Sequence, residues 1–406
     1  MKRGLKGIVL LLLPVTIGSV SAVVYEVGPG KTYESISDVP WEIVTAGDLV
    51  LIYYREEPYR EKWVICRQGT EAEKIVVRGM PNENGYLPVI EAIDATTRSA
   101  LNFWNEERGM IKIGGANSPP DCMPQNIVIE NLDIKSGRPP YSFTGRSGRA
   151  DYSSNAAAIY VEKGKNITIR NCILRDCGNG FFCASGASNV LVEGCSIYDN
   201  GIEDSIYEHN NYTEANGIVF QSNRFGALRS GCLGNNLKDR SSGCVIRYNW
   251  IESGNRQLDL VDSNHSEIYS APEYRATYVY GNILIEPDGA GNSQVCHYGG
   301  DSGDTDRYRK GTLYFYNNTV VSTRTGNTTL LRLSSMDESC DSRQITWFYT
   351  TASEPPHLAI TNHQGAPNFL NNWLKENWRK SHCNPDAVVN DVSGNTEGSM
   401  PRFHGF

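Results

Sequence analysis

The residues best suited to chemistry cluster between positions 234 and 262. The candidate catalytic groups there are Lys238, Arg240, Asp259 and Asp262, and the candidate substrate-binding groups are Asn236, Arg256 and Gln257. Cations and carboxylates this close suit proton abstraction beside a sugar carboxylate, which needs that acid neutralised and a base within hydrogen-bond reach. We predict Lys238 or Arg240 as the base and Arg256 as the partner of the carboxylate. The alternative is that Lys238, Asp239 and Arg240 form a solvated ion-pair turn.

Strand alternation extends this cluster to later residues. Leu258 and Leu260 would face the interior together, so Gln257 and Asp259 would face solvent. Similar strands follow around His297 and Arg332, and we predict both as substrate-binding groups in one column with Asp259. The alternation around His297 leaves open whether its side chain points outward or inward.

A glycine-rich acidic segment at residues 299–306 is a candidate metal site. Its carboxylates are Asp301, Asp304 and Asp306, and hard oxygen ligands at this density suit Ca²⁺. The segment lacks the downstream Glu of an EF-hand loop, so an ordinary polar loop stays open beside the calcium site.

Repeated segments must position all these residues. Six segments share alternating apolar residues followed by a bend, and the bends carry one equivalent side chain each: Leu132, Cys172, Cys195, Asn249, Asn282 and Asn318. Repeats that cannot bury their own apolar face must stack on one another. The three Asn amides would hydrogen-bond along the stack and satisfy backbone groups of the bends.

This pattern resembles the right-handed parallel β-helix of the pectate-lyase superfamily, closely over residues 120–335 and loosely over 25–120. We therefore predict an all-β chain with a single-stranded parallel β-helix at 23–340, capped at its ends, and a capping or packing tail at 341–406. The unequal spacing of the repeats disfavours a β-propeller, and the lack of regular hairpin turns disfavours a β-sandwich.

The segments Arg240–Gly243 and Ile246–Asn249 resemble polysaccharide lyases of the alginate lyase and chondroitinase B type. Those enzymes carry K-S-x-x-N followed by R-Y-N, with the lysine as base. With R-Y-N superposed, their lysine falls on Arg240, and their arginine on the next strand falls near Val261. Their calcium-binding glutamates have no counterpart before Arg240. The resemblance implies β-elimination of an extracellular, anionic polysaccharide by an altered set of residues.

Two other functions stay open. A glycoside hydrolase would pair Asp259 with Asp262, or Asp301 with Asp304, although the N-T-D and G-H-G segments of the related polygalacturonases are absent. A non-catalytic surface solenoid that binds polysaccharide is the third possibility.

The ends and composition of the chain suggest where it acts. A basic start, the apolar run Gly7–Val20 and small residues up to Ala22 predict a signal peptide at 1–22 and a secreted, extracellular or periplasmic protein. The net charge of −8 without a basic patch disfavours nucleic-acid partners. We expect a monomer with no membrane segment after the signal. The 11 cysteines permit disulfides or a ladder of buried thiols, and the sequence does not decide the connectivity.

Overall fold

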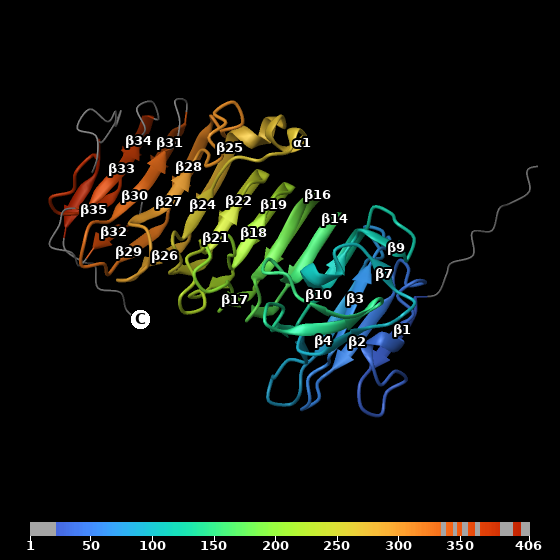
Figure 1. Cartoon of the computed structure of the whole chain (residues 1–406). Helices are drawn as coiled ribbons and strands as arrows, with labels where there is room; N and C mark the ends of the chain where they lie inside the picture. Colours follow the sequence, from blue (N-terminus) through green and yellow to red (C-terminus); the bar gives the residue numbers. More distant parts are fainter. Residues whose placement is uncertain are drawn as a thin grey trace, which may run out of the picture.

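The computed structural model describes residues 22–333, 338–343, 347–350, 356–361, 366–381 and 393–398. Their strands stack in parallel along one axis from the N-terminal to the C-terminal end, as Figure 1 shows. Most coils contribute one strand to each of three ladders, so the molecule is a parallel β-helix. The predicted signal peptide lies outside the described residues but for Ala22, and it stays a prediction.

The first ladder runs the length of the stack. Its strands are β1 (Val24–Val27), β2 (Leu49–Tyr53), β4 (Ile75–Met80), β10 (Gln125–Glu130), β14 (Ala157–Arg170), β16 (Asn179–Glu193), β19 (Asn216–Gln221), β22 (Ser242–Arg247), β25 (Ala276–Tyr280), β28 (Thr312–Tyr316), β31 (Ser339–Arg343) and β34 (Ala366–Leu370). Strands β14 and β16 are long enough to belong to the second ladder as well.

The second ladder carries the candidate site. Besides the first halves of β14 and β16, it contains β3 (Glu61–Ile65), β8 (Gly109–Ile113), β18 (Asn211–Thr213), β21 (Leu237–Asp239), β24 (Leu258–Leu260), β27 (Gln294–Tyr298), β30 (Thr329–Leu333) and β33 (His357–Thr361).

The third ladder holds short strands that close each coil. They are β5 (Val89–Glu91), β11 (Asp133–Lys135), β15 (Ile173–Arg175), β17 (Ser196–Tyr198), β20 (Arg224–Phe225), β23 (Trp250–Glu252), β26 (Ile283–Glu286), β29 (Thr319–Ser322), β32 (Trp347–Thr350), β35 (Trp373–Lys375) and β36 (Thr396–Gly398).

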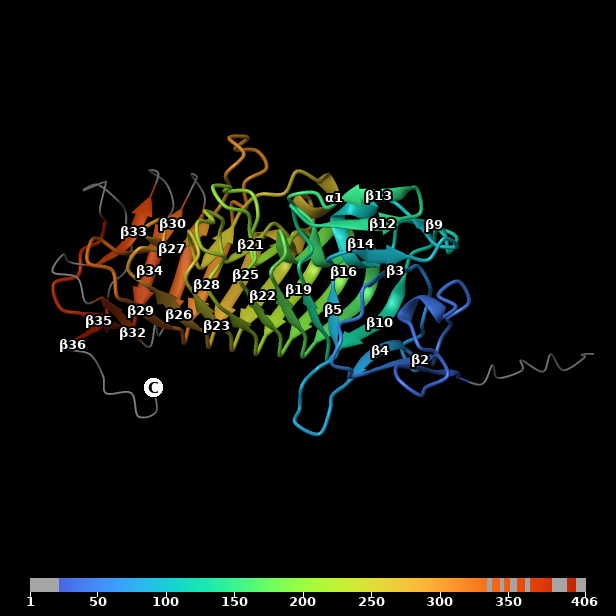
Figure 2. The same ribbon diagram turned by 60° about the horizontal axis from the view of Figure 1, so that its bottom comes forward.

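The remaining elements are insertions between coils. They are η1 (Ile36–Asp38), β6 (Ala95–Thr97), β7 (Asn102–Phe103), η2 (Glu106–Arg108), β9 (Ala116–Ser118), the antiparallel hairpin β12 (Ser142–Gly145) and β13 (Gly148–Asp151), α1 (Ser266–Tyr269) and η3 (Pro272–Arg275). Figure 2 shows the β12–β13 hairpin beside β14 and β3. No helix in the described part of the chain is long and apolar enough to cross a membrane.

The predicted stacking is confirmed, with one coil missed. The amide of Asn249 donates to Asn282 Oδ1 at 2.9 Å, and Asn282 donates to Asn318 Oδ1 at 2.9 Å. Each acceptor oxygen also takes a backbone N–H of the preceding bend. Asn223 extends this ladder by donating to Asn249 Oδ1 at 3.0 Å. Its coil, built on β19 and β20, divides the long interval between Cys195 and Asn249.

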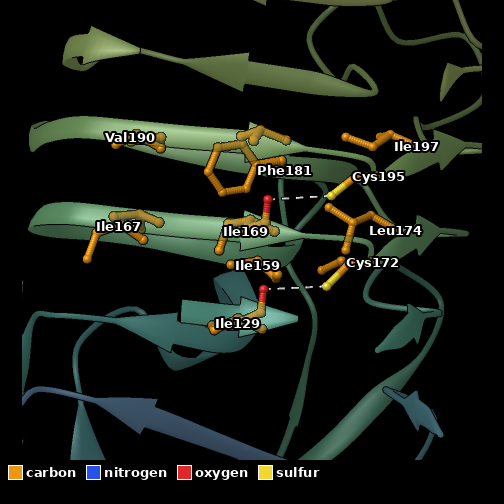
Figure 3. Packing of buried hydrophobic residues seen from close by; sticks show 14 of the residues in the cluster. Ile129, Ile159, Ile167, Ile169, Cys172, Leu174, Phe181, Val190, Cys195 and Ile197 are labelled. Carbon is orange, nitrogen blue, oxygen red and sulfur yellow. Dashed lines mark hydrogen bonds between the residues drawn. The ribbon is translucent and has the colours of Figure 1, made fainter. Parts of the chain in front are cut away.

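The core lies inside the coils and is mostly aliphatic. Ile129, Ile169 and Phe181 are fully buried, and Figure 3 shows them in rows between successive strands. The thiols of Cys172 and Cys195 donate to the carbonyl oxygens of Ile129 and Ile169, at 3.8 and 3.7 Å. These cysteines are free thiols, so the bends there are filled by buried sulfhydryls.

The two ends of the stack show how the core is covered and how far the strand pairing extends. At the N-terminal end Ile36 and Trp41 are fully buried, and Trp41 stacks on Trp63 of β3 at 5.5 Å, which covers apolar core. Parallel pairing continues from β31 to β36 beyond the predicted boundary at residue 340. Backbone hydrogen bonds hold these strands, so coils continue although the apolar alternation of the sequence weakens there.

Candidate functional site

The second ladder forms a single column of outward side chains across eight strands. Strand pairing places in order Lys112, Tyr160, Phe182, Tyr212, Lys238, Asp259, His297 and Arg332. Successive members lie one coil apart, about 4.8 Å. The column therefore changes from aromatic at Phe182 and Tyr212 to charged from Lys238 onward.

A pocket of about 490 Å³ opens over the charged half of this column. The residues that line it are Ile206, Tyr207, His209, Tyr212, Asn235, Lys238, Arg240, Asn255, Arg256, Asp259, His297, Gly300, Asp301, Gly303, Tyr308 and Arg332. The loop before β18 and the loop after β27 supply its walls. Tyr207 on the first of these loops is 74% exposed.

Strand β21 shows why these residues reach the pocket. Leu237 and Asp239 face the interior and are fully buried, while Lys238 and Arg240 point outward. Asp239 accepts hydrogen bonds from Thr213 Oγ1 at 2.8 Å and from the guanidinium of Arg309 at 3.2 Å. The solvated ion-pair turn that the sequence left open is therefore wrong, because Asp239 is an interior anchor.

Arg309 fixes the loop after β27 to the two preceding coils. It is fully buried and donates to the carbonyl oxygens of Asp239, Ser241 and Val261 at 2.9–3.1 Å. Asp262 holds the same loop by accepting the backbone N–H of Asp301 at 2.7 Å. These contacts fold the loop back so that Asp301 lies at the wall of the pocket.

Lys238 lies at the centre of the pocket between two carboxylates. Its Nζ is 2.5 Å from Asp259 Oδ2 and 2.7 Å from Asp301 Oδ2. Arg240 also binds Asp301, with Nη2 2.9 Å from Oδ1, and its Nε donates to Tyr212 Oη at 3.1 Å. Both cations are thus engaged in ion pairs with carboxylates, which disfavours either of them as a base.

Asp259 is the most heavily bonded carboxylate of the pocket. Besides Lys238 it contacts Asn235 Nδ2 at 2.8 Å, His297 Nδ1 at 2.8 Å and Arg256 Nη1 at 3.7 Å. Burial raises the pKa of Asp259, but Lys238, His297 and Arg256 outweigh it and hold the pKa well below its usual value. In the same way Lys238 and Arg240 outweigh burial and lower the pKa of Asp301.

The two histidines of the pocket are neutral groups. Burial, reinforced by the charge of Lys238, lowers the pKa of His209 to about 3. The backbone N–H of Asn235 donates to His209 Nδ1 at 2.9 Å, so the ring proton is on Nε2. Burial also lowers the pKa of His297 although Asp259 opposes this. With Asp259 ionised, His297 Nδ1 is the donor of their hydrogen bond.

Arg256 and Arg332 give the C-terminal side of the pocket a positive charge. Arg256 donates to Gln294 Oε1 at 3.1 Å, while its buried Nε has no hydrogen-bond partner. No carboxylate among the described residues pairs with Arg332. Among the described residues that line the pocket there are four cations and two carboxylates, so with neutral histidines this lining carries two surplus positive charges.

Several predicted site residues lie elsewhere. Gln257 is fully buried and donates to Glu286 at 2.5 Å, because it stands at the bend before β24, where alternation does not apply. Asn236 is also fully buried and donates to the carbonyl oxygen of Glu252 at 2.7 Å. Asp262 lies beneath the pocket floor and positions the loop after β27. These three do not line the pocket.

The predicted metal ligands do not converge. Asp301 binds Lys238 and Arg240, Asp304 pairs with Arg307 at 2.9 Å, and the side chain of Asp306 is 96% exposed. No group of three His, Cys, Asp or Glu side chains within the described ranges could hold a metal ion. The acidic segment therefore does not fit the expected Ca²⁺, since Asp301 is already paired with two cations and the other two carboxylates point elsewhere.

Sequence reasoning missed His209, Tyr212 and Asn235. His209 and Tyr212 belong to the coil built on β18 and β19, which the repeat pattern overlooked because an irregular loop separates β17 from β18, and Asn235 lies beside His209 on the next coil, just before β21. The bend residue Asn223 was the available signal. Placing a coil there would have set Tyr212 beside Lys238.

Comparisons with known proteins agree with this architecture. A family model described as "Right handed beta helix region" matches residues 96–272. No curated protein matches the sequence. The solved structure of an alginate lyase from Paenibacillus sp. str. FPU-7 is similar, with 11% identity, a TM-score of 0.54, and coverage of 80% of this chain and 94% of that one.

Two further structures are similar at comparable levels. A mutant tailspike protein of E. coli bacteriophage HK620 in complex with pentasaccharide has 10% identity and a TM-score of 0.51, covering 88% of this chain and 59% of the tailspike. DFA-IIIase from Arthrobacter chlorophenolicus A6, without its lid and in complex with GF2, has 11% identity and a TM-score of 0.51, covering 94% and 100%. At these identities the similarity establishes the fold, a right-handed β-helix.

Proposed function

We propose that this chain is a secreted enzyme that binds an anionic extracellular polysaccharide and cleaves it by β-elimination. The observation that carries the proposal is the positive pocket: four cations against two carboxylates, in a chain whose net charge is −8. Such a local excess of positive charge attracts an anionic substrate although the chain as a whole is acidic. A similar fold in an alginate lyase, and another in a tailspike that holds a pentasaccharide, agree with a carbohydrate substrate.

Arg256 and Arg332 would neutralise the carboxylate of the sugar. The buried Nε of Arg256 has no partner within the protein, and a buried donor without a partner costs about 1–3 kcal/mol. That atom is closed to solvent, so a bound carboxylate would pair with the part of the Arg256 side chain that lines the pocket. Neutralising this acid makes the proton on the adjacent carbon easier to remove, which is the difficult step of the elimination.

Tyr212 is the proton-transfer group that the geometry favours. Its ring is fixed edge-on against Phe182 at 5.4 Å and His209 at 5.5 Å, and Arg240 Nε donates to its oxygen at 3.1 Å. The guanidinium lies beside the atom on which negative charge develops when the tyrosine gives up its proton. The phenolate oxygen would take the sugar proton adjacent to the carboxylate, and the C–H electrons would form the new double bond.

Lys238 and His209 would act on the other side of the reaction. As the C–O bond to the leaving sugar breaks, the protonated Lys238 can donate to the departing oxygen and recover a proton from solvent. The Nε2–H of neutral His209 is a hydrogen-bond donor for negative charge developing on the substrate. This arrangement replaces the predicted role of Lys238 or Arg240 as base.

The structure gives hydrolysis less support. A glycosidase needs one carboxyl group that is protonated at the working pH, which calls for a raised pKa. The pKa values of Asp259 and Asp301 are both lowered, and Asp262 is engaged in holding a loop. The predicted pairs of aspartates are therefore poor acid–base partners.

A panel of polysaccharides tests the proposal. The protein is incubated with polygalacturonate, alginate, chondroitin sulfate and a neutral glycan, with and without chelator, while ultraviolet absorbance of unsaturated products and new reducing ends are recorded together. We expect both signals with at least one anionic polymer, and activity that survives chelator because side-chain cations face the substrate. New reducing ends without absorbance would indicate hydrolysis. Binding with no cleavage of any polymer would indicate a non-catalytic solenoid.

A further inference from the structure

Two cysteines at the N-terminal end of the stack lie in contact although 56 residues separate them. Cys66 directly follows β3, and Cys122 lies in the connection between β9 and β10. Their Sγ atoms are 3.9 Å apart, and the backbone N–H of Cys122 donates to Cys66 Sγ at 3.4 Å. Cys66 is buried, whereas Cys122 is partly exposed.

We propose that Cys66 and Cys122 form a disulfide bond when the folded chain meets a thiol–disulfide oxidant. A disulfide bond has a length of about 2.05 Å, so the two sulfur atoms must approach by about 2 Å. Rotation of the partly exposed Cys122 side chain is the least costly way to achieve this approach, because Cys66 is packed in the core. The inference does not depend on the proposed enzymatic activity.

The reaction can be written in two exchange steps. The Cys122 thiolate attacks one sulfur of a small disulfide such as oxidised glutathione, forming a mixed disulfide and releasing one glutathione thiol. Cys66 then attacks Cys122 Sγ and releases the second glutathione, so two protein thiols are oxidised and one glutathione disulfide is reduced. Burial and the neighbouring Cys66 raise the pKa of Cys122 to about 11. The first step is therefore faster at alkaline pH, where more thiolate is present.

Another pair of neighbouring thiols serves as an internal comparison. Cys172 and Cys195 also occupy adjacent coils, but each donates its S–H to a carbonyl oxygen of the core. Both are about 1% exposed, and burial raises the pKa of Cys172 well above its usual value. No oxidant reaches them in the folded protein, so they remain thiols.

Peptide mapping without reduction tests this inference. The folded full-length protein is equilibrated with oxidised and reduced glutathione at alkaline pH, quenched in acid, unfolded, alkylated and digested. We expect a cross-linked peptide pair containing Cys66 and Cys122, and alkylated peptides for Cys172 and Cys195. Recovery of Cys66 and Cys122 as alkylated thiols, or joined to other cysteines, would overturn the assignment.

Thermal unfolding supplies a second readout with matched variants. A disulfide that closes a loop of this size stabilises mainly by restricting the unfolded chain. The oxidised wild type should therefore unfold several degrees higher than the same sample after reduction. A Cys66→Ser variant should lose this response to reductant, while Cys232→Ser, which removes another partly exposed thiol, should keep it. An equal response in the Cys66→Ser and wild-type proteins would contradict the proposal.

Discussion

The ammonium group of Lys238 lies 2.7 Å from the carboxylate of Asp301, although Asp301 stands 63 residues later in the chain. This contact joins β21 to the loop after β27, and the second ion pair of Lys238, with Asp259, joins β21 to β24. The same lysine thus supports both the shape of the pocket and its charge. Removing it should affect stability and activity together.

Replacing Lys238 by Ala should abolish cleavage and lower the free energy of unfolding by about 3 kcal/mol, since it leaves two carboxylates without their shared cation. Urea unfolding and initial rates measure the two effects. The variant Lys238→Met combined with Asp259→Asn should recover part of the stability but no activity. Lys310→Ala, which removes a lysine paired with the exposed Asp306, is the control and should change neither. Full activity in Lys238→Ala would refute the role of this cation.

Tyr212→Phe should reduce kcat by about 100-fold or more, the usual contribution of a positioned acid–base group. The ring remains, so its packing against Phe182 and His209 and the affinity for polymer should hardly change. Stopped assays of unsaturated product give kcat, and binding is measured separately by calorimetry. Tyr314→Phe, on the first ladder where the ring stacks on Tyr278, is the matched control. A Tyr212→Phe enzyme with normal kcat would exclude the phenol from proton transfer.

Arg332→Ala should raise KM for an anionic polymer by about tenfold, equivalent to roughly 1.4 kcal/mol, with a smaller change in kcat. Arg332 faces the pocket, and no described carboxylate competes with the substrate for its charge. Arg224→Ala removes the same charge from the third ladder and should leave KM unchanged. The loss in affinity should shrink at high salt, because screening weakens the attraction for both proteins. An unchanged KM in Arg332→Ala would remove this residue from the substrate site.

The sequence was sufficient for the fold because stacking leaves a repeated signature. The alternating apolar residues indicate strands with one buried face. The bend asparagines Asn249, Asn282 and Asn318 indicate the positions where successive coils turn and stack. The same alternation correctly set Asp259 outward, and pairing then placed it in one column with His297 and Arg332.

The site was harder to predict because coils of unequal length bring distant residues together. Asp301 looked like a calcium ligand among neighbouring carboxylates, but the loop after β27 folds back and sets it between Lys238 and Arg240. Gln257 broke the alternation because it precedes the strand at a bend. Such placements depend on loop paths and buried anchors such as Arg309, which leave no periodic pattern in a sequence.

The pH dependence of stability should reveal the buried His209. The pKa of His209 is about 3 in the folded protein, well below the usual 6.5. Below pH 6.5 this histidine therefore binds a proton in the unfolded chain but not in the folded chain. The folded state therefore loses stability as the pH falls, by about 1.4 kcal/mol per pH unit, or about 2 kcal/mol from this residue at pH 5.

A His209→Asn variant isolates that contribution. Asn Oδ1 can replace Nδ1 as the acceptor for the backbone N–H of Asn235, while the titrating ring is gone. Urea unfolding at pH 7 and pH 5 should give a smaller loss of stability in the variant than in the wild type. His297 titrates in the same direction in both proteins and cancels in this difference. Equal losses in the two proteins would show that His209 is protonated in the folded state, and its role as a neutral Nε2–H donor to the substrate would fall with that result.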